Sequence, residues 1–479
     1  MPTFVAVDLG ATSGRVVNVR LDRDSIELEL VRRFPTEAVV DGDGELAWNF
    51  DALLDEVTAG LTDAVTGERV ASVAVDSWAV DYGLLDADGR RIGPVHAYRS
   101  ARTDGVMDAV CTRVGRERIY SITGIQFLPF NTAYQLVAAR ETSEYTRARG
   151  LLMVPDLVNH ALCRSSTNDV TNASTTQLLD AATRSWSDEL IDELGLRREL
   201  LPGLHEPGSE LGTVRDFAPA VDGLRVVAAA SHDTASAVAG VPLRPDRRGI
   251  YISCGTWSLV GCEVGAPIAS GEALTANVTN ELGVGGTVRL LKNVTGLWLL
   301  EECRRTWAAE GLKADAAALV TAAGDVQGGR SVVDPDDPSF AVPGDMPSRI
   351  GAYCRRTGQP VPTSPAEVTR TILDSLALAW RKTVSTIERV TGFEGDVLHL
   401  VGGGSSIQLL RELCASACGR PVIAGPAEAT VVGNAIVQAI AGGVLIDLAE
   451  GRQLVERSLG LVEVAPRQTL DWDTLATRL

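Results

Sequence analysis

The sequence is short of basic residues. Lysine and arginine together number 44, against 62 aspartates and glutamates, so the net charge is −18. Nucleic-acid binding needs a basic face, and this balance therefore argues against a nucleic-acid partner. Any anionic ligand must instead be held by local devices such as backbone amides, a few arginines and a metal ion.

Cysteine and histidine are also scarce. Eight cysteines among 479 residues, with no Cys-x-x-Cys pair, exclude a disulfide scaffold, and five histidines disfavour a zinc site. Cys414 and Cys418 stand four residues apart on an expected helix. This spacing favours two small buried side chains, with an oxidised pair as the geometric alternative.

Long apolar runs are missing as well. No segment is long enough to cross a bilayer, and the first residues enter a strand without a basic leader. We therefore expect a cytoplasmic protein with no membrane partner, either a monomer or a small homo-oligomer. Proline and charge replace the apolar pattern at residues 242–249. With this linker, the length predicts two domains, 1–242 and 249–479.

The chain is organised around residues 224–240. An apolar run of strand length, Leu224 to Ala230, is followed by Ser-His-Asp-Thr and then by a small-residue helix that Thr234 is able to cap. A carboxylate where a strand meets a helix lies where α/β sheets place their chemistry. We predict that Asp233 is a general base acting on an alcohol. The alternative is that Asp233 is only a helix cap or turn residue.

A glycine- and hydroxyl-rich turn follows the first predicted strand, residues 4–9. Residues 10–15 read Gly-Ala-Thr-Ser-Gly-Arg, and residues 16–20 are expected to form the returning strand. Backbone amides, hydroxyls and Arg15 suit a phosphate, and Asp8 could face a metal that the phosphates carry. No Gly-Lys-Ser/Thr follows, and a strand rather than a helix comes next, which excludes a Walker loop and a Rossmann fingerprint. The alternative is a plain glycine-containing hairpin.

The second half of the chain repeats this design. Residues 250–253 and 259–261 are expected to be strands around the turn Cys-Gly-Thr-Trp-Ser, so two such domains would grip a polyphosphate from both sides. A later strand runs into Gly402-Gly403-Gly404, where a base or phosphate can lie on bare backbone. Residues 433–435 are expected to open a helix that packs beneath this glycine turn.

Two carboxylates flank a tryptophan at the end of another expected strand. The run Asp76-Ser77-Trp78-Ala79-Val80-Asp81 suits a polyol, since acids accept hydroxyl protons and an indole covers an apolar face. The alternative is a core tryptophan beside two turn aspartates.

Together these motifs resemble the FGGY family of carbohydrate kinases. The resemblance runs along nearly the whole chain and is most specific in Gly-Ile-Gln-Phe-Leu-Pro-Phe-Asn and Ala-Ser-His-Asp-Thr-Ala-Ser-Ala-Val. The residues that carry it are 5–15, 76–81, 124–131, 171–178, 230–238, 255–259 and 401–404. It implies an α/β fold of two actin-like (ribonuclease H-like) domains hinged over a central cleft, and Mg²⁺-dependent phosphorylation of L-rhamnulose at O1 by ATP.

The resemblance also implies roles for individual residues. Asp233 matches the proton acceptor, and Asp8 is the expected metal ligand. The residues that match sugar contacts are Ala79, His232, Asp233, Thr234 and Asn293. The residues that match nucleotide contacts are Ala11, Thr12, Ser13, Gly14, Arg15, Thr256, Glu301 and Gly403.

Three positions depart from the family pattern. Ala79 replaces the glycine of a Trp-Gly-Val-Asp motif, which a backbone contact would tolerate. Ser100 replaces an aspartate of a Tyr-Arg-Asp-x-Arg-Thr run and weakens the sugar assignment. Glu301 replaces a glutamine on the nucleotide side, where an acid would repel phosphate unless it meets a ribose hydroxyl.

Two other functions compete with this interpretation. One is a kinase of the same fold for another ketose or polyol, such as L-fuculose or D-xylulose. The other is a non-catalytic sugar or nucleotide sensor, which would not need to keep a base at Asp233. A substrate panel separates the first rival, and ADP release with and without sugar separates the second.

Overall fold

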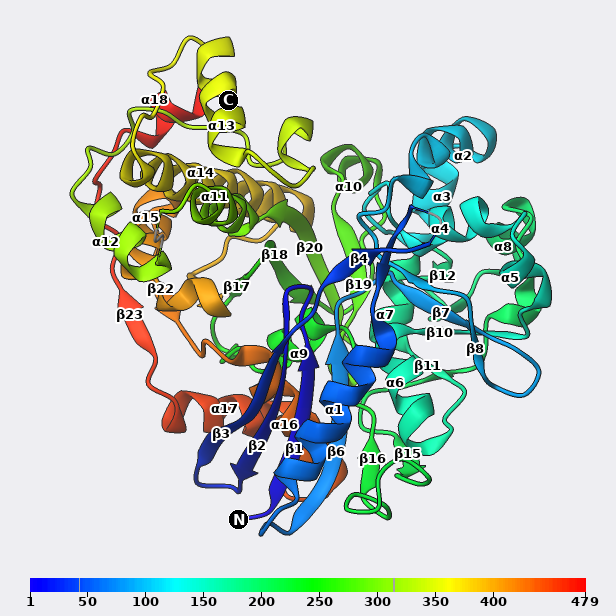
Figure 1. Cartoon of the computed structure of the whole chain (residues 1–479). Coiled ribbons are helices and arrows are strands. Elements are labelled where there is room, and N and C mark those ends of the chain that lie inside the picture. Colours follow the sequence, from blue (N-terminus) through cyan, green and yellow to red (C-terminus); the bar gives the residue numbers. More distant parts are fainter. Residues whose placement is uncertain (43, 313–314) are drawn as a thin grey trace. The chain divides into compact units, whose positions relative to one another are not determined.

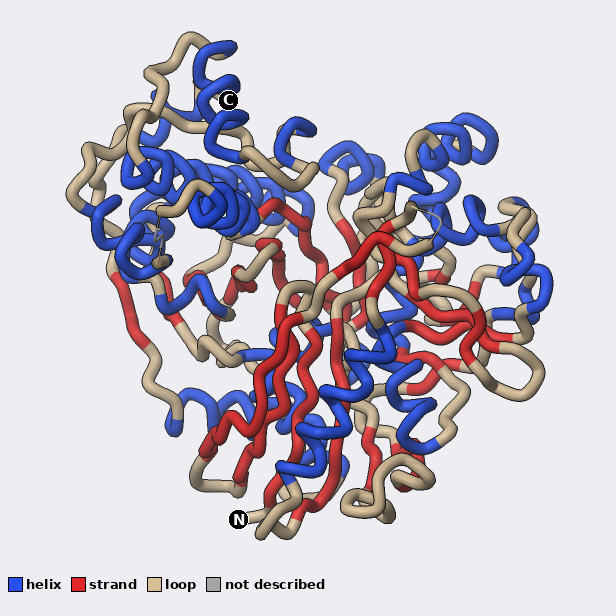
Figure 2. The backbone as a smooth tube through the Cα atoms, in the orientation of Figure 1, coloured by secondary structure: helices blue, strands red, loops and turns tan. Residues whose placement is uncertain are grey.

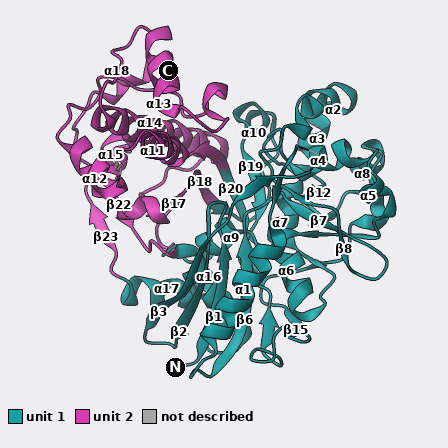
Figure 3. Cartoon of the chain, in the orientation of Figure 1, with its two compact units in different colours: residues 1–242, 263–291, 429–459 teal, residues 243–262, 292–428, 460–479 magenta. Residues whose placement is uncertain are grey.

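The computed structural model describes residues 1–42, 44–312 and 315–479. The chain forms two compact units (Figure 3). Unit 1 comprises Met1–Pro242, Glu263–Leu291 and Ala429–Leu459, and unit 2 comprises Leu243–Cys262, Lys292–Glu428 and Gly460–Leu479. The expected domains, 1–242 and 249–479, stay a prediction of how the sequence divides. The compact units add two later segments to unit 1.

The core of unit 1 is a mixed six-stranded sheet, visible as neighbouring red strands in Figure 2. Its order is β15-β16-β6-β1-β2-β3, in which β1, β6 and β16 run parallel, β2 pairs antiparallel with β1, and β3 pairs antiparallel with β2. The bounds are β1 Thr3–Leu9, β2 Ser13–Leu21, β3 Ile26–Pro35, β6 Val70–Ser77, β15 Glu210–Thr213 and β16 Arg225–Val227. The predicted hairpin of β1 and β2 is therefore confirmed.

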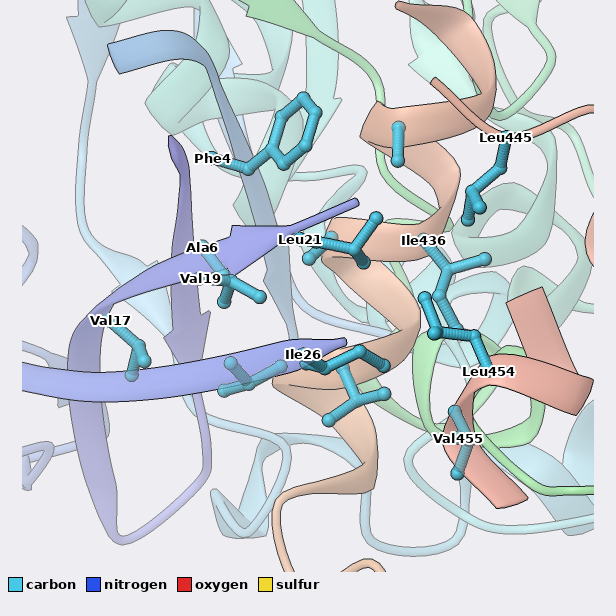
Figure 4. Close-up of a cluster of buried hydrophobic side chains, with 14 residues drawn as sticks. Phe4, Ala6, Val17, Val19, Leu21, Ile26, Ile436, Leu445, Leu454 and Val455 are labelled. Carbon is cyan, nitrogen blue, oxygen red and sulfur yellow. The ribbon is translucent and has the colours of Figure 1, made fainter. Parts of the chain in front are cut away.

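Side chains of β2 alternate between the two faces of this sheet, as strand geometry requires. Val17, Val19 and Leu21 join a buried cluster with helices α16 (Ala429–Ala441) and α17 (Leu448–Ser458), shown in Figure 4. On the other face, the Asn18 amide donates to the carbonyl of Ala64 in helix α1 (Phe50–Ala64) at 3.1 Å. Burial of each large aliphatic side chain contributes about 1.5–3 kcal/mol, so this core fixes the strands that carry the site.

Helix α9 (Asp233–Ala239) packs on α16 through small residues. A Cβ at Gly433 would lie 1.8 Å from the Ser236 carbonyl oxygen, and one at Gly240 would lie 2.4 Å from that of Ala429. The expectation that residues 433–435 open a helix is wrong, because α16 begins at Ala429. They lie in the middle of α16, where the absence of a side chain at Gly433 lets α9 approach.

Unit 2 contains the second hairpin and repeats the strand arrangement. The strand order is β20-β18-β17-β21-β22-β23, with β17, β21 and β22 parallel and β18 antiparallel to β17. The bounds are β17 Gly249–Cys254, β18 Trp257–Val264, β20 Val288–Thr295, β21 Val397–Val401, β22 Val422–Ala424 and β23 Val462–Val464. In both units a central strand, β1 or β17, forms an antiparallel hairpin with the next strand and pairs in parallel with a later one. The predicted internal repeat is therefore confirmed.

The longest helix of unit 2 begins at a capping box. The Ser364 hydroxyl accepts from the backbone N–H of Glu367, whose side chain accepts from the Ser364 backbone. The main helices of this unit are α11 Trp298–Ala309, α12 Ala316–Gly324, α13 Met346–Arg356, α14 Pro365–Thr391 and α15 Gln408–Cys418. No helix in the described part of the chain combines the length and apolar composition needed to cross a membrane.

Candidate active site

Three carboxylates of unit 1 meet at the carboxyl ends of parallel strands. Asp8 on β1 and Asp76 on β6 are register partners, and a parallel bridge joins Ser77 to His232 just before Asp233. The backbone N–H of Ser77 donates to the Ser231 carbonyl at 2.8 Å. This edge is where open α/β sheets bind ligands, so the topology gathers acids from three separate parts of the sequence.

Asp8, at the end of β1, holds the side chain of Arg15 in place beside the first glycine turn. The guanidinium Nη2 and Nε lie 2.6 and 2.7 Å from Asp8 Oδ2. The turn closes with the Gly10 N–H donating to the Ser13 carbonyl at 3.1 Å. Thr36, which directly follows β3, reinforces the turn by donating its hydroxyl to the Gly10 carbonyl at 2.5 Å.

The five predicted nucleotide residues of this turn differ in exposure. Thr12 is exposed, whereas Ala11, Ser13 and Arg15 are half-buried. Gly14 is buried, and a Cβ there would lie 2.3 Å from the ring of Phe34. Packing against Phe34 is therefore sufficient to require glycine at this position, independently of any phosphate.

Asp76 is fully buried and held by the last segment of unit 1. Asn434 Nδ2 on α16 donates to Asp76 Oδ2 at 2.6 Å, while Oδ1 has no hydrogen-bond partner within the described structure. Burial raises the pKa of Asp76 well above its usual range, and the negative charge of Asp8 adds to this effect. A protonated Asp76 would donate from its unpartnered oxygen.

Asp233 is the first residue of α9, and His232 is the N-cap without a side-chain capping bond. The prediction that Thr234 caps this helix is therefore wrong. Thr234 lies in the first turn, and its hydroxyl donates to Asp233 Oδ1 at 3.0 Å. The Asp233 side chain is 30% exposed, and burial by the surrounding protein raises its pKa.

The turn before Asp233 is clamped by an acid that the sequence alone did not single out. Asp169 Oδ1 accepts the backbone N–H of Ser231 at 3.1 Å, and the Thr171 hydroxyl, which donates to Asp169, accepts from the backbone N–H of His232 at 3.2 Å. Burial raises the pKa of Asp169, which is completely inaccessible. The backbone that presents His232 and Asp233 is thereby fixed from one side.

The side chain of His232 is also surrounded by charge. Its Nε2 lies 3.4 Å from Asp233 Oδ1, and its Nδ1 lies 3.2 Å from both Glu281 Oε2 and Arg289 Nη2. Sequence reasoning missed Glu281 and Arg289. A signal was available for Arg289, which is a lone charge in the apolar run 288–291 after the glycine-rich turn 283–286, whereas Glu281 stands among polar residues before that turn.

The predicted polyol site around Trp78 has a different organisation. Asp81 is completely buried, and its two oxygens accept four hydrogen bonds from protein donors. The donors are Trp48 Nε1 at 2.7 Å, Trp78 Nε1 at 3.0 Å, the Tyr98 backbone at 3.1 Å and Gln135 Nε2 at 3.0 Å. The alternative of a core tryptophan beside an internal aspartate therefore describes Asp81 better than a sugar contact does.

The loop that contains Ala79 is strained. Ala79 is half-buried, and the next residue, Val80, has φ of +66°, which a β-branched residue rarely adopts. Hydrogen bonds to the Val80 carbonyl from Thr132 Oγ1 at 2.6 Å and Gln135 Nε2 at 3.3 Å hold this conformation. Such strain is typical of ligand-binding loops, which supports the prediction that Ala79 contacts substrate through its backbone.

Ser100 has a local structural role. Its hydroxyl accepts from the backbone N–H of Arg102 at 3.2 Å and donates to the carboxylate of Glu45. Serine and aspartate are comparably good caps, so the replacement at this position leaves the turn intact.

Two of the predicted ligand residues of unit 2, Thr256 and Gly403, follow the neighbouring strands β17 and β21. The Thr256 carbonyl accepts from the N–H groups of Gly296 and Trp298 at 3.1 and 3.2 Å, next to the start of α11. Gly403 is exposed and follows β21, the parallel neighbour of β17. Glu301 on α11 pairs with Arg304 at 2.6 Å, and Asn293 is half-buried near the end of β20.

Two sequence questions concern metals and thiols. No group of three or more His, Cys, Asp or Glu side chains in the described ranges is arranged to hold a metal ion by itself. Mg²⁺ commonly keeps several waters and uses one or two carboxylates together with substrate phosphates, and the Asp8 carboxylate fits that limited role.

Cys414 is buried and Cys418 half-buried, and both are free thiols.

Comparison with protein families places the chain among known sequences. The N-terminal domain model of the FGGY family of carbohydrate kinases matches residues 3–240, and the C-terminal domain model matches residues 250–442. A rhamnulokinase of Bacteroides thetaiotaomicron is 40% identical over 98% of this chain and 97% of its own length. A rhamnulokinase of Pectobacterium carotovorum is 44% identical over 98% of this chain and 94% of its own length.

Solved structures of sugar kinases share the fold. The xylulose kinase of Lactobacillus acidophilus, 15% identical, superposes with a TM-score of 0.80 over 100% of this chain and 96% of its own. The xylulose kinase of Rhodospirillum rubrum, 20% identical, gives 0.77 over 99% and 97%. The expectation of an α/β fold of the sugar-kinase type is confirmed.

Proposed function

This chain belongs to the FGGY family of carbohydrate kinases, and from that premise we propose that it transfers a phosphoryl group from ATP to O1 of L-rhamnulose. ATP as co-substrate is implied by the family. Support for the ketose comes from full-length similarity to proteins named rhamnulokinase. The single observation that carries the chemistry is Asp233, a partly exposed carboxylate that neighbouring hydrogen bonds orient.

In this proposal Asp233 takes the proton from the sugar hydroxyl as the bond to phosphorus forms. The donors Thr234 Oγ1 and His232 Nε2 both lie near Oδ1, so we assign Oδ2 to the sugar. The remaining sugar contacts are assigned to Ala79 and Asn293. Because burial raises the pKa of Asp233, kcat/KM should fall as the pH drops through that raised value and the base becomes protonated.

The nucleotide is assigned to the two glycine turns. Residues 11–15, with Arg15 held by Asp8, would donate to its phosphates from one turn, and Thr256 and Gly403 would contact it in unit 2. Arg304 offsets the charge of Glu301, which suits a ribose hydroxyl better than a phosphate. Asp8 would bind Mg²⁺, which when bound neutralises phosphate charge. Alignment and charge neutralisation are most of what phosphoryl transfer requires of a protein.

A coupled ADP-release assay across ketoses tests this proposal. The purified protein with ATP and Mg²⁺ should show its highest kcat/KM with L-rhamnulose and little ADP release without sugar. A higher kcat/KM for L-fuculose or D-xylulose would contradict the substrate assignment. Sugar binding by calorimetry with no ADP release from any ketose would indicate a sensor.

A further inference from the structure

A buried ion pair next to the proposed base is not used by the proposed chemistry. Glu281 on β19 (Thr279–Leu282) and Arg289 on β20 are cross-strand partners, and Arg289 Nη2 lies 3.1 Å from Glu281 Oε2. The two side chains are 5% and 0% exposed. Buried ion pairs add little net stability because both charges lose their hydration. Stability alone is therefore a poor reason for this pair.

Both members of the pair reach the same atom of His232. Its Nδ1 lies 3.2 Å from Glu281 Oε2 and 3.2 Å from Arg289 Nη2. A guanidinium only donates hydrogen bonds and a carboxylate only accepts them. With a proton on Nδ1 the ring donates to Glu281, and without one it accepts from Arg289. The position of this proton decides what Nε2, 3.4 Å from Asp233 Oδ1, presents to the base.

Charge balance favours an unprotonated Nδ1. Arg289 already neutralises Glu281, and its Nε donates to the Leu282 carbonyl at 3.2 Å, which fixes the guanidinium. A cationic imidazole would have to use Asp233, 3.4 Å from Nε2, as its counter-ion, and a neutral ring with its proton on Nε2 makes the same contact. The other charged groups around the turn are Asp233 itself, Asp169 behind Ser231, and Asp8 and Asp76, which act on Asp233.

We propose that Arg289 and Glu281 are positioning residues for the base. Arg289 donates to Nδ1 of His232 and so keeps the imidazole neutral, with its proton on Nε2 facing Asp233 Oδ1, while Glu281 holds Arg289 in place. This inference rests on the proposed function, in which Asp233 accepts the sugar proton. The imidazole then orients the carboxylate without lowering its basicity as a cation would.

Nitrogen NMR of ¹⁵N-histidine-labelled protein reads the ring state directly and needs no activity. The chain has five histidines, so a His232→Gln spectrum identifies the signals of His232. At neutral pH the wild-type ring should be neutral with Nε2 protonated. In Arg289→Met, the unbalanced Glu281 should convert it to imidazolium. A wild-type ring protonated at Nδ1 would overturn the proposal.

The pH profile gives a second readout whose sign is diagnostic. In Arg289→Met a cationic His232 next to Asp233 should move the acidic limb of kcat/KM to lower pH. If Arg289 acted on Asp233 only through its charge, its loss would move the acidic limb of kcat/KM to higher pH. A shift to higher pH, or no shift, would overturn the proposal. Because the base loses its alignment, kcat should fall by up to about 10²-fold, with a smaller change in the ketose KM.

Two further variants keep the test decisive. Removing one partner of a buried ion pair destabilises a protein, so Glu281→Gln/Arg289→Met removes both charges. It should restore a neutral ring and the wild-type acidic limb of kcat/KM, since no carboxylate remains next to Nδ1 of His232. A limb that stays shifted would contradict the proposal. Arg20→Met, which breaks the half-exposed pair with Glu29 and Glu68, is the matched control and should leave the limb in place.

The two proposals fail separately. If wild-type protein phosphorylates L-rhamnulose but the limb of Arg289→Met does not move down, only the positioning role is lost. If no ketose is phosphorylated, the proposed function is lost, and the NMR spectrum still decides the state of His232.

Discussion

The amide of Asn434 donates to Asp76 Oδ2 over 2.6 Å, which links a helix near the end of unit 1 to a strand that carries the site. The link continues inward. Gln438 Nε2 donates to Asn434 Oδ1 at 2.7 Å and to the Val5 carbonyl at 3.0 Å, and its Oε1 accepts from Ser72 at 2.7 Å. A polar chain through the sheet thus fixes Asp76 on β6 relative to β1.

Breaking this chain should destabilise the protein. Asn434→Leu leaves buried groups of Asp76 and Gln438 without partners, at about 1–3 kcal/mol for each unsatisfied group, so the free energy of unfolding should fall by about 2–5 kcal/mol. Urea denaturation measures it. Asp76→Asn is the control and should cost less stability. The pKa of Asp76 is raised well above its usual range, and asparagine is a neutral isostere that still accepts from Asn434. Equal losses in both variants would contradict this account.

Asp81 should make stability depend on pH. Burial raises its pKa from 3.8 to about 6, although Trp48 and Gln135 donate to it. As the pH rises from about 4 to 6, the Asp81 carboxyl of the unfolded chain ionises before that of the folded protein. The free energy of unfolding therefore falls, by up to about 3 kcal/mol, and it falls no further above pH 6.

The measurement for Asp81 is urea denaturation of wild type and Asp81→Asn from pH 4 to 7. The stability of wild type relative to the variant should decrease as pH rises to 6 and then level off. A difference that is flat across this range, or that grows with pH, would contradict the raised pKa.

The glycine turn of unit 2 offers a matched pair of variants for the nucleotide assignment. A Cβ at Gly403 would meet no heavy atom within 4 Å, whereas one at Gly404 would lie 2.4 Å from Cys254 Sγ. Gly403→Ala should therefore fold normally and raise the KM for ATP, because a methyl group would cover the backbone. Gly404→Ala should lower Tm. A Gly403→Ala enzyme with an unchanged KM for ATP would remove Gly403 from the nucleotide site.

Arg15 should act on the nucleotide more than on the sugar. A hydrogen bond to a charged group contributes about 1.5–3 kcal/mol, so Arg15→Ala should raise the KM for ATP about tenfold or more, with a smaller effect on the ketose KM. Steady-state kinetics with each substrate varied in turn gives both constants. Arg20→Ala on the same strand, whose partners are Glu29 and Glu68, should leave the KM for ATP unchanged. Equal effects of the two variants would argue against a phosphate contact.

Local patterns in the sequence were sufficient to predict the hairpins and Asp233. Apolar runs interrupted by glycine and hydroxyl residues specify β1 with β2 and β17 with β18, because strand alternation and turn chemistry act over a few residues. The strand that leads to Asp233 is shorter than expected, since β16 covers only Arg225–Val227. The residues after it continue as extended backbone that bridges to Ser77.

Contacts between distant segments could not be predicted in this way. The sequence leaves the polyol and core interpretations of Asp81 open, because nothing near it in sequence shows that Trp48 and Gln135 would donate to it. The close packing of α16 on α9 at Gly433 and Gly240 could not be predicted, because the two helices lie far apart in the sequence. Glu281 and Arg289 were overlooked because their role appears only when the hairpin brings them to His232.

The kcat of Asp233→Asn tests the central claim most directly. Asparagine keeps the size and most hydrogen bonding of aspartate but cannot accept the proton, and loss of a general base costs about 10²–10⁴-fold in rate. We predict a fall of kcat in that range with L-rhamnulose, with ketose binding retained by calorimetry. Tm should change little, because the N-cap of α9 is His232 rather than Asp233. A folded Asp233→Asn protein with near-normal kcat would contradict the assignment and leave Asp233 as a structural residue.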